Sequence, residues 1–173
     1  MTTSESGSAL DAIDRRILDA LQDDCAQTNQ ELAERVQTSP ATCLRRVRRL
    51  VDGGVIERRI AILAPDVLKA GAWGGVAVGI TAIVEVTLDR QSTESLAAFE
   101  ERATADPAVQ QCYRVASGPD FVLIVYVADT DAYQALARRL FTAAADVRNV
   151  KAYFSVRRAK FSPRIPLDGP SSG

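Results

Sequence analysis

The residues of this sequence best suited to chemistry are four arginines within five positions, namely Arg45, Arg46, Arg48 and Arg49. A guanidinium group is a planar fork of donors that matches phosphate oxygens and the major-groove edge of guanine. A run of positive charge that stands alone is about as often a solvated helix face. The elements around the run must therefore decide between these two interpretations.

The sequence predicts that the arginines lie on a helix from Ser39 to Asp52. The Ser39 hydroxyl can accept a hydrogen bond from a free first-turn amide, Pro40 suits the first helical position, and two glycines follow the helix. Steps of three and four residues predict its buried apolar stripe as Leu44, Val47, Leu50 and Val51. The side chains expected to face away from that stripe are Thr42, Arg45, Arg46 and Arg49.

Two further helices are predicted before the arginine helix. Thr28 and Glu31 form a capping box at the start of a short helix, and residues 37–40 join that helix to the next with the length of a helix-turn-helix connection. Residues 10–21 carry apolar side chains at helical spacing, so three helices are expected to share one core. The DNA contacts expected from this unit are Thr28, Asn29, Gln30, Ser39, Pro40, Thr42, Arg45, Arg46 and Arg49.

Residues 55–63 follow the helix-turn-helix and are rich in β-branched side chains. This composition predicts a strand pair or wing. Arg58 and Arg59 would then touch the phosphate backbone beside the groove, which adds affinity without sequence information. We therefore add both to the expected DNA contacts.

The overall charge does not by itself indicate a nucleic-acid partner. Lysine and arginine total 21 against 22 for aspartate and glutamate, and five aspartates gather in the first helix. Only the placement of charge favours DNA. The chain has no histidine, which excludes the serine–histidine–acid triad, the cysteine–histidine dyad and histidine-ligated zinc. We expect no enzyme activity, no metal and no cofactor.

The second half of the sequence predicts a different architecture. Strands are expected over residues 80–88, 109–116, 121–128 and 150–156, with one helix starting at Ser92 and another at Thr130 or Asp131. The order βαββαβ is the ferredoxin-like arrangement, in which two helices cover one face of a four-stranded antiparallel sheet. Too many apolar residues, including Ile83, Val122 or Leu123, Tyr153 and Phe154, remain for a solvated opposite face, so a partner subunit is expected to cover it.

These predictions define an α+β chain of two domains. The expected parts are a disordered N-terminus (1–9), a winged helix-turn-helix DNA-binding domain (10–63), a linker (64–79), a ferredoxin-like ligand-binding and oligomerisation domain (80–167) and a flexible C-terminus (168–173). No apolar run approaches the roughly 20 residues that span a bilayer, and the first eight residues are polar. We expect a cytoplasmic protein with no membrane partner and with three reduced cysteines.

The sequence resembles the Lrp/AsnC feast/famine regulators from Leu10 to about Leu167. Residues 10–18 resemble the family's opening Leu-Asp-x-Ile-Asp-x-x-Ile-Leu, and Ser39-Pro40, residues 46–50 and residues 54–56 resemble its recognition helix and exit turn. Residues 84–88 resemble the first strand of its ligand-binding domain. The resemblance implies dimers, often octamers, that assemble through their sheets, with amino acids as typical effectors bound between subunits.

Two segments depart from the family's pattern. The family commonly carries Gly-x-x-Asp-Tyr between the second and third strands, where this chain has the residues expected to bind an effector: Ser117, Gly118, Asp120 and Phe121 around Pro119. Asp120 could hold an α-amino group and the Gly118 region a carboxylate, but a tight hairpin turn with a capping aspartate explains the same residues. The joint over residues 73–79 is longer and richer in glycine than is usual in the family.

The residues and the family resemblance together predict a sequence-specific transcription regulator that acts on double-stranded DNA and is controlled by a small molecule, and the resemblance implies an amino acid as that molecule. Two alternatives stay open. One is a siroheme-decarboxylase-like enzyme of the same architecture, whose proposed chemistry uses histidines that this chain lacks. The other is an effector-binding module that has lost DNA binding.

Overall fold

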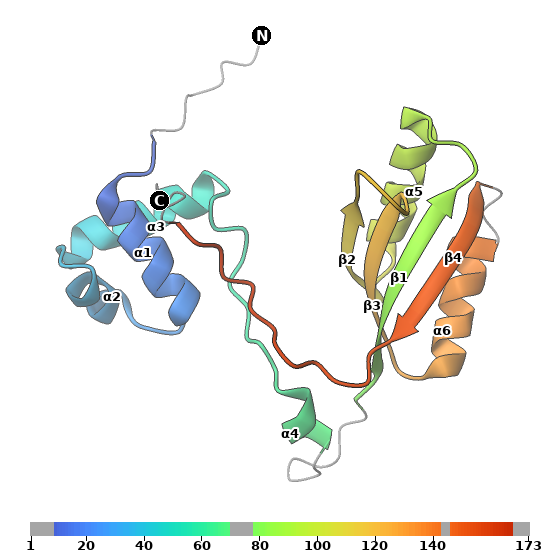
Figure 1. Ribbon diagram of the computed structural model, residues 1–173. Helices are drawn as coiled ribbons and strands as arrows, with labels where there is room; N and C mark the ends of the chain where they lie inside the picture. The colour runs from blue at the N-terminus through green and yellow to red at the C-terminus, as the bar shows by residue number, and fades with distance from the viewer. Residues whose placement is uncertain (1–8, 70–77, 143–145, 168–173) are drawn as a thin grey trace, which may run out of the picture. The chain divides into compact units, whose positions relative to one another are not determined.

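The computed structural model describes residues 9–69, 78–142 and 146–167, and these form two compact units (Figure 1). One unit contains the chain up to Leu63 together with the segment from Ser162 onward, and the other runs from Ala64 to Phe161. The sequence analysis predicted disorder for residues 1–9 and 168–173, and all of these except Ala9 lie outside the described residues. Most of the joint over residues 73–79 also lies outside them. No helix of the described residues is long and apolar enough to cross a membrane.

The first unit contains three helices: α1 (Ala12–Asp23), α2 (Asn29–Arg35) and α3 (Pro40–Asp52). The predicted Thr28–Glu31 capping box and the Ser39 cap of α3 are both confirmed. Between α2 and α3 the chain turns through Gln37, whose φ of 57° places a non-glycine residue in the left-handed region. Gly54, with φ 71°, makes the exit turn after α3.

The buried face of α3 differs from the predicted stripe at two of its four positions. Val47 and Leu50 are buried with Cys43, whereas the side chains of Leu44 and Val51 are 40% and 44% exposed. The reason is geometric, because residues 43, 47 and 50 lie at steps of four and three and face the shared core of α1 and α2. Burial also raises the pKa of the Cys43 thiol, which suits a packing role.

The strand pair expected over residues 55–63 is not formed. Residues 57–64 have no regular secondary structure and are exposed, and the Ile56 amide donates to the Leu50 carbonyl as part of the helix exit. A strand needs a neighbour for its backbone groups, and no other described segment pairs with this one. β-Branched composition alone therefore did not suffice to make a strand here.

The second unit begins with a short helix, α4 (Pro65–Lys69), that lies in the predicted linker. The predicted order βαββαβ then follows as β1 (Ile80–Leu88), α5 (Thr93–Ala105), β2 (Val109–Arg114), β3 (Phe121–Val127), α6 (Thr130–Ala137) continued by a π-helical turn η1 (Arg138–Thr142), and β4 (Val147–Phe154). The strands pair antiparallel in the order β2-β3-β1-β4. Helices α5 and α6 both lie on one face of the sheet (Figure 1), as predicted.

Alternating strand residues divide the sheet into a buried and an exposed face. Val84, Val86, Leu123 and Val125 are fully buried and pack with Phe99 of α5 and Leu136 of α6. On the opposite face Ile83, Tyr113 and Tyr153 are 40%, 52% and 51% exposed. The placement of Ile83, Tyr153 and Val122 on that face agrees with the register. Leu123 and Phe154 lie on the face covered by the helices instead. The rings of Phe154 and Tyr133 pack edge to face, with their centroids 4.9 Å apart.

Several boundaries also differ from the sequence analysis, since β2 and β3 end one or two residues earlier than predicted. Strand β4 starts at Val147 and ends at Phe154, earlier at both ends than predicted. The segment from Ser162 to Leu167, which the sequence analysis placed in the second domain, groups with the first unit. The reason lies in long-range contacts with α1 that no local pattern in the sequence reveals.

Candidate DNA-binding and effector sites

The start of α3 is fixed by contacts within the turn and from α2. The Ser39 hydroxyl accepts the Thr42 amide at 3.2 Å and lies 2.9 Å from the Thr42 hydroxyl. The Asn29 side-chain amide donates to the Pro40 carbonyl at 2.9 Å, which ties the first turn of α2 to the first turn of α3. These residues, predicted as DNA contacts, therefore at least hold the two helices of the motif in register.

A buried carboxylate on α1 holds the middle of α3. Asp14 is 0% exposed, and its two oxygens accept hydrogen bonds from Arg46, at 2.9 Å, and from Arg49. Arg46 also contacts Asp11 at 2.6 Å. A buried charge is tolerated only when it is paired and hydrogen-bonded, so these contacts fix where α3 lies against α1. Arg46 and Arg49, which the sequence analysis placed toward DNA, thus also bind α1, and their contact with DNA stays a prediction.

The pairing of Arg46 and Asp11 gives a test of this arrangement. The Asp14 backbone N–H and the Arg46 guanidinium lower the pKa of Asp11 from 3.8 to about 2. Since the folded-state pKa is depressed, the stabilisation is present above pH 3.8 and is lost as the pH falls toward 2. We expect Arg46→Gln to raise the Asp11 pKa only part of the way to 3.8, because the Asp14 amide bond remains. Carboxyl ¹³C NMR titration measures this, with Arg45→Gln as control; an unchanged value in R46Q would contradict the pairing.

Three arginines of α3 are exposed, and two of them, Arg45 and Arg48, make no ion pair within the described residues, whereas Arg49 pairs with Asp14. The sequence analysis named Arg45 but omitted Arg48. The omission follows from the wrong apolar stripe, because residue 48 lies four positions after Leu44 and three before Val51, on the face then assigned to the core. With Cys43 placed on the buried face of the helix, the same spacing would have predicted Arg48 as an exposed residue.

The remaining predicted DNA contacts lie at the surface, and several already have partners. Thr28 bonds Glu31, Gln30 bonds Glu34 at 2.6 Å, and Arg58 pairs with its neighbour Glu57 at 2.6 Å. Arg59 is exposed, and no ion pair of Arg59 is present within the described part of the chain. These residues are accessible to DNA, and their contact with DNA stays a prediction.

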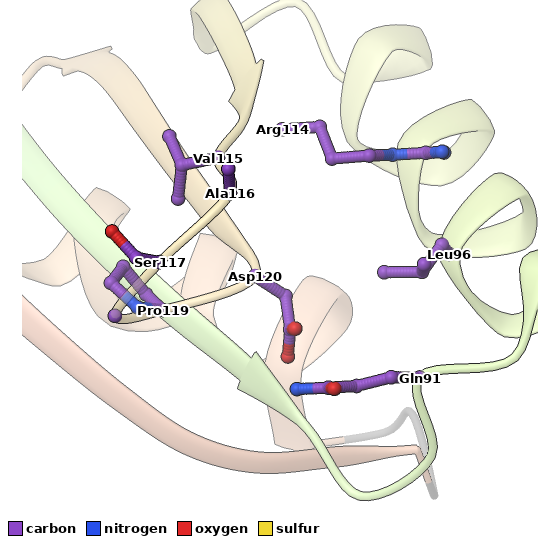
Figure 2. A pocket seen from close by; sticks show the side chains of 9 residues that line it. Gln91, Leu96, Arg114, Val115, Ala116, Ser117, Pro119 and Asp120 are labelled. Atoms are coloured by element: carbon purple, nitrogen blue, oxygen red, sulfur yellow. The ribbon is translucent and has the colours of Figure 1, made fainter.

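A second candidate site is an open hollow of about 360 Å³ beside the turn between β2 and β3 (Figure 2). Its walls are Gln91, Leu96, Arg114, Val115, Ala116, Ser117, Gly118, Pro119 and Asp120. Figure 2 shows the side chains of Asp120 and Gln91 pointing toward each other across it. Gly118 has φ 85°, which allows the backbone to turn here.

Asp120 has a structural partner as well as a place in the hollow. One carboxylate oxygen accepts the Leu88 amide at 2.7 Å, and the Asp120 amide donates to the Val86 carbonyl at 2.9 Å. These bonds fix the turn to the end of β1. Asp120 also lines the hollow, so its position agrees with both interpretations of the sequence, the capped turn and the effector contact.

Three of the four predicted effector residues line the hollow, and one does not. Phe121 is fully buried, with its ring 4.7 Å from Phe99, so it belongs to the core. The alternation of β3 turns Phe121 inward with Leu123 and Val125. Conversely, Gln91, Leu96 and Arg114 were not predicted, because they come from other elements; Arg114 pairs with Glu100 of α5 at 2.6 Å.

Two family models match this chain, one in each half of the sequence. Residues 10–57 match a winged helix-turn-helix DNA-binding model, and residues 81–165 match the Lrp/AsnC ligand binding domain. Both candidate sites lie within these matches, with the arginine helix in the first and the hollow in the second.

Comparison with whole proteins gives the same result. The chain is 38% identical to the leucine-responsive regulatory protein of Rhizobium meliloti over 91% of this chain and 96% of that protein. An AsnC family transcriptional regulator from Agrobacterium tumefaciens superposes with a TM-score of 0.77 at 32% identity, covering 92% and 98% of the two chains. A Neisseria meningitidis transcriptional regulator in complex with L-Met gives 0.74 at 28% identity, with the same coverages. The chain thus belongs to the Lrp/AsnC family of DNA-binding transcription regulators.

Proposed function

We propose that this regulator reads DNA with the exposed face of α3 and is controlled by an amino acid bound to its second unit. The DNA part of this proposal rests on the different roles of the arginines of α3. Arg46 and Arg49 hold the helix to Asp14, while Arg45 and Arg48 remain exposed on it. A helix fixed to its scaffold with free arginines suits insertion into a major groove.

Dimerisation would place two such helices on one DNA molecule. The sheet face opposite α5 and α6 exposes Ile83, Tyr113 and Tyr153, and an apolar patch of this kind favours a second copy of the same sheet. Two recognition helices would then meet half-sites about one helical turn apart. Higher assemblies such as octamers would use further surfaces.

The effector part rests on the hollow beside Asp120. The second oxygen of that carboxylate can accept an α-amino group, and the turn at Ser117 and Gly118 can approach a carboxylate through its backbone amides. The Neisseria relative in complex with L-Met supports an amino acid as the class of ligand. With such a ligand the chain acts as a regulator, not as an enzyme.

The DNA part is tested by fluorescence anisotropy with the region upstream of the chain's own gene and a scrambled duplex of equal length, across a range of KCl concentrations. We expect tighter binding to the upstream region and a steep loss of affinity with salt. Equal affinity for both duplexes would contradict sequence-specific regulation.

The effector part is tested by a thermal-shift screen of the amino acids. A ligand that binds only the native state stabilises it by mass action, so at least one amino acid should raise the Tm. Asp120→Asn keeps an oxygen for the Leu88 amide but removes the charge that would hold an ammonium group, and we expect it to weaken that ligand about tenfold to a hundredfold. The control is Asp89→Asn, an exposed carboxylate outside the hollow. Equal ligand affinity in D120N and D89N would contradict the site.

A further inference from the structure

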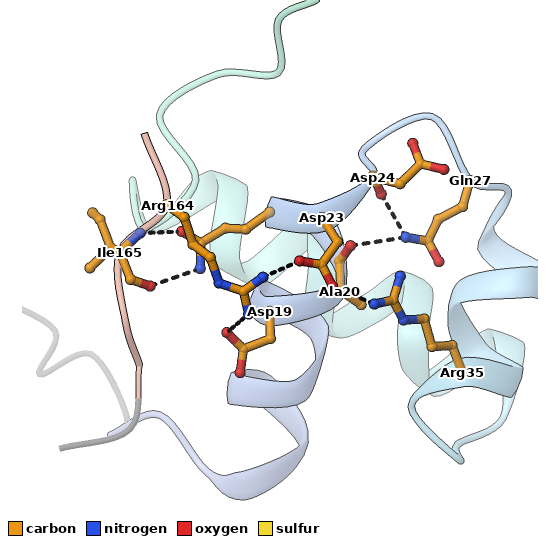
Figure 3. A network of polar contacts seen from close by, with 9 residues as sticks. Asp19, Ala20, Asp23, Asp24, Gln27, Arg35, Arg164 and Ile165 are labelled. Atoms are coloured by element: carbon orange, nitrogen blue, oxygen red, sulfur yellow. Dashed lines mark hydrogen bonds and ion pairs between the residues drawn. The ribbon is translucent and has the colours of Figure 1, made fainter. Parts of the chain in front are cut away.

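The outer face of α1 carries Asp19, Gln22 and Asp23, and residues 164–165 are docked on it. Figure 3 shows Arg164 and Ile165 beside this helix. The Gln22 side chain makes two hydrogen bonds to the backbone of Ile165. Its amide nitrogen donates to the Ile165 carbonyl at 3.0 Å, and its carbonyl oxygen accepts the Ile165 amide at 2.7 Å. Two bonds of this kind resemble a rung of a β-ladder and fix the position of an extended segment along the helix.

Charge complementarity adds to this contact. Figure 3 shows the Arg164 guanidinium directed at Asp19 and Asp23. Its nitrogen lies 3.2 Å from an Asp19 carboxylate oxygen, and a second ion pair joins it to Asp23. Asp23 also pairs with Arg35 of α2 at 2.5 Å, so one carboxylate joins α1, α2 and Arg164. The aspartates of the first helix argued against a nucleic-acid partner. Two of them, Asp19 and Asp23, are thus paired with arginines of the same unit.

An apolar contact completes the docking. Leu167 is half-buried and packs against the helical core of the first unit. Residues 155–161, just before this segment, are exposed and make no hydrogen bond to the first unit among the described residues. Among the described residues of this part of the chain, the attachment thus lies within residues 162–167, and we call this segment the C-terminal clasp.

We propose that the C-terminal clasp is a working part of the DNA-binding unit and gives it a second connection to the ligand-binding unit. The chain joins the two units once through residues 64–79 and again through residues 155–161, and the second connection exists only while the clasp is docked on α1. A tether at two points restricts reorientation of each DNA-binding unit more than a tether at one point. Changes in the ligand-binding unit are then transmitted through both connections.

The consequence for DNA concerns paired half-sites, and this part of the inference rests on the proposed function. In a dimer, binding of the second half-site is intramolecular, and its effective concentration falls when the units reorient freely. Release of the clasp should therefore weaken binding to two half-sites about tenfold, and change binding to one half-site less than twofold.

The experiment uses the full chain with Arg164→Glu and Gln22→Ala, and with Arg157→Glu as the matched control, since Arg157 is exposed in the undocked stretch. The first measurement is hydrogen exchange of the Ile165 amide, which needs no DNA. We expect slow exchange in the native chain and in R157E, and at least tenfold faster exchange in R164E and Q22A. Circular dichroism checks that α1 stays helical.

The second measurement is affinity for one-site and two-site duplexes. A loss in R164E on the two-site duplex alone, with R157E unchanged, supports the clasp. An unprotected Ile165 amide in the native chain, or equal two-site affinities in R164E and R157E, would overturn it. If the native chain binds neither duplex, the proposed function fails, and the exchange rates alone decide whether the clasp docks.

Discussion

Replacing Asp14 with alanine is expected to lower the free energy of unfolding of the first unit by about 3 kcal/mol and to remove most DNA binding. Asp14 is fully buried and is the shared acceptor for Arg46 and Arg49. Without it the Arg46 guanidinium, whose Nε atom is already buried without a partner, keeps only the exposed Asp11 as its acceptor. Breaking a buried pair on one side leaves an uncompensated charge, which costs more than the pair contributed.

The effect on DNA follows from geometry. In D14A the middle of α3 is held to α1 only by the exposed Arg46–Asp11 ion pair and by the apolar contacts of Cys43, Val47 and Leu50, so the angle of the helix is less firmly fixed. Chemical denaturation measures the stability, and anisotropy measures the affinity at a temperature where the variant remains folded. Asp52→Ala is the control, because it removes the same charge from an exposed position at the end of α3. If D14A were as stable as D52A, Asp14 would not position the helix.

The helices of the first unit could be predicted because the features that define them are local. The capping box at Thr28, the cap at Ser39 and the glycines after Asp52 each act within four residues, and the structure forms all of them. The strands of the second unit could be predicted from β-branched composition, and their order then indicated the fold. The same composition was misleading at residues 55–63, because a strand also needs a neighbouring strand.

The contacts that could not be predicted join residues far apart in the sequence. Arg46 and Asp14 are 32 positions apart, and Gln22 and Ile165 are 143 apart. Spacing shows which side of a helix a residue occupies but not which other element faces it. The hollow has the same origin, since Gln91, Leu96 and Arg114 meet the predicted turn only after the sheet forms.

Arg45→Ala is expected to lower the affinity for the operator, the DNA sequence that the regulator recognises, about tenfold to a hundredfold without changing the free energy of unfolding. Arg45 is exposed on α3, and no ion pair of Arg45 occurs in the described ranges, so its removal costs the fold nothing. Arg46→Ala should behave differently, because it takes a partner from buried Asp14 and so lowers stability together with affinity. The two neighbouring arginines thus separate contact with DNA from support of the helix.

Anisotropy with the operator and with a scrambled duplex, each over a series of KCl concentrations, distinguishes the kinds of contact that Arg45 makes. If Arg45 binds a phosphate, the salt slope falls by about one and both duplexes lose affinity equally; if it binds a base edge, the loss is larger on the operator. Arg90→Ala, an exposed arginine of the second unit, controls for the loss of one charge. Equal affinities of R45A and R90A on every duplex would mean that α3 does not enter DNA by this face, and the anchoring of Arg46 and Arg49 would then serve the fold alone.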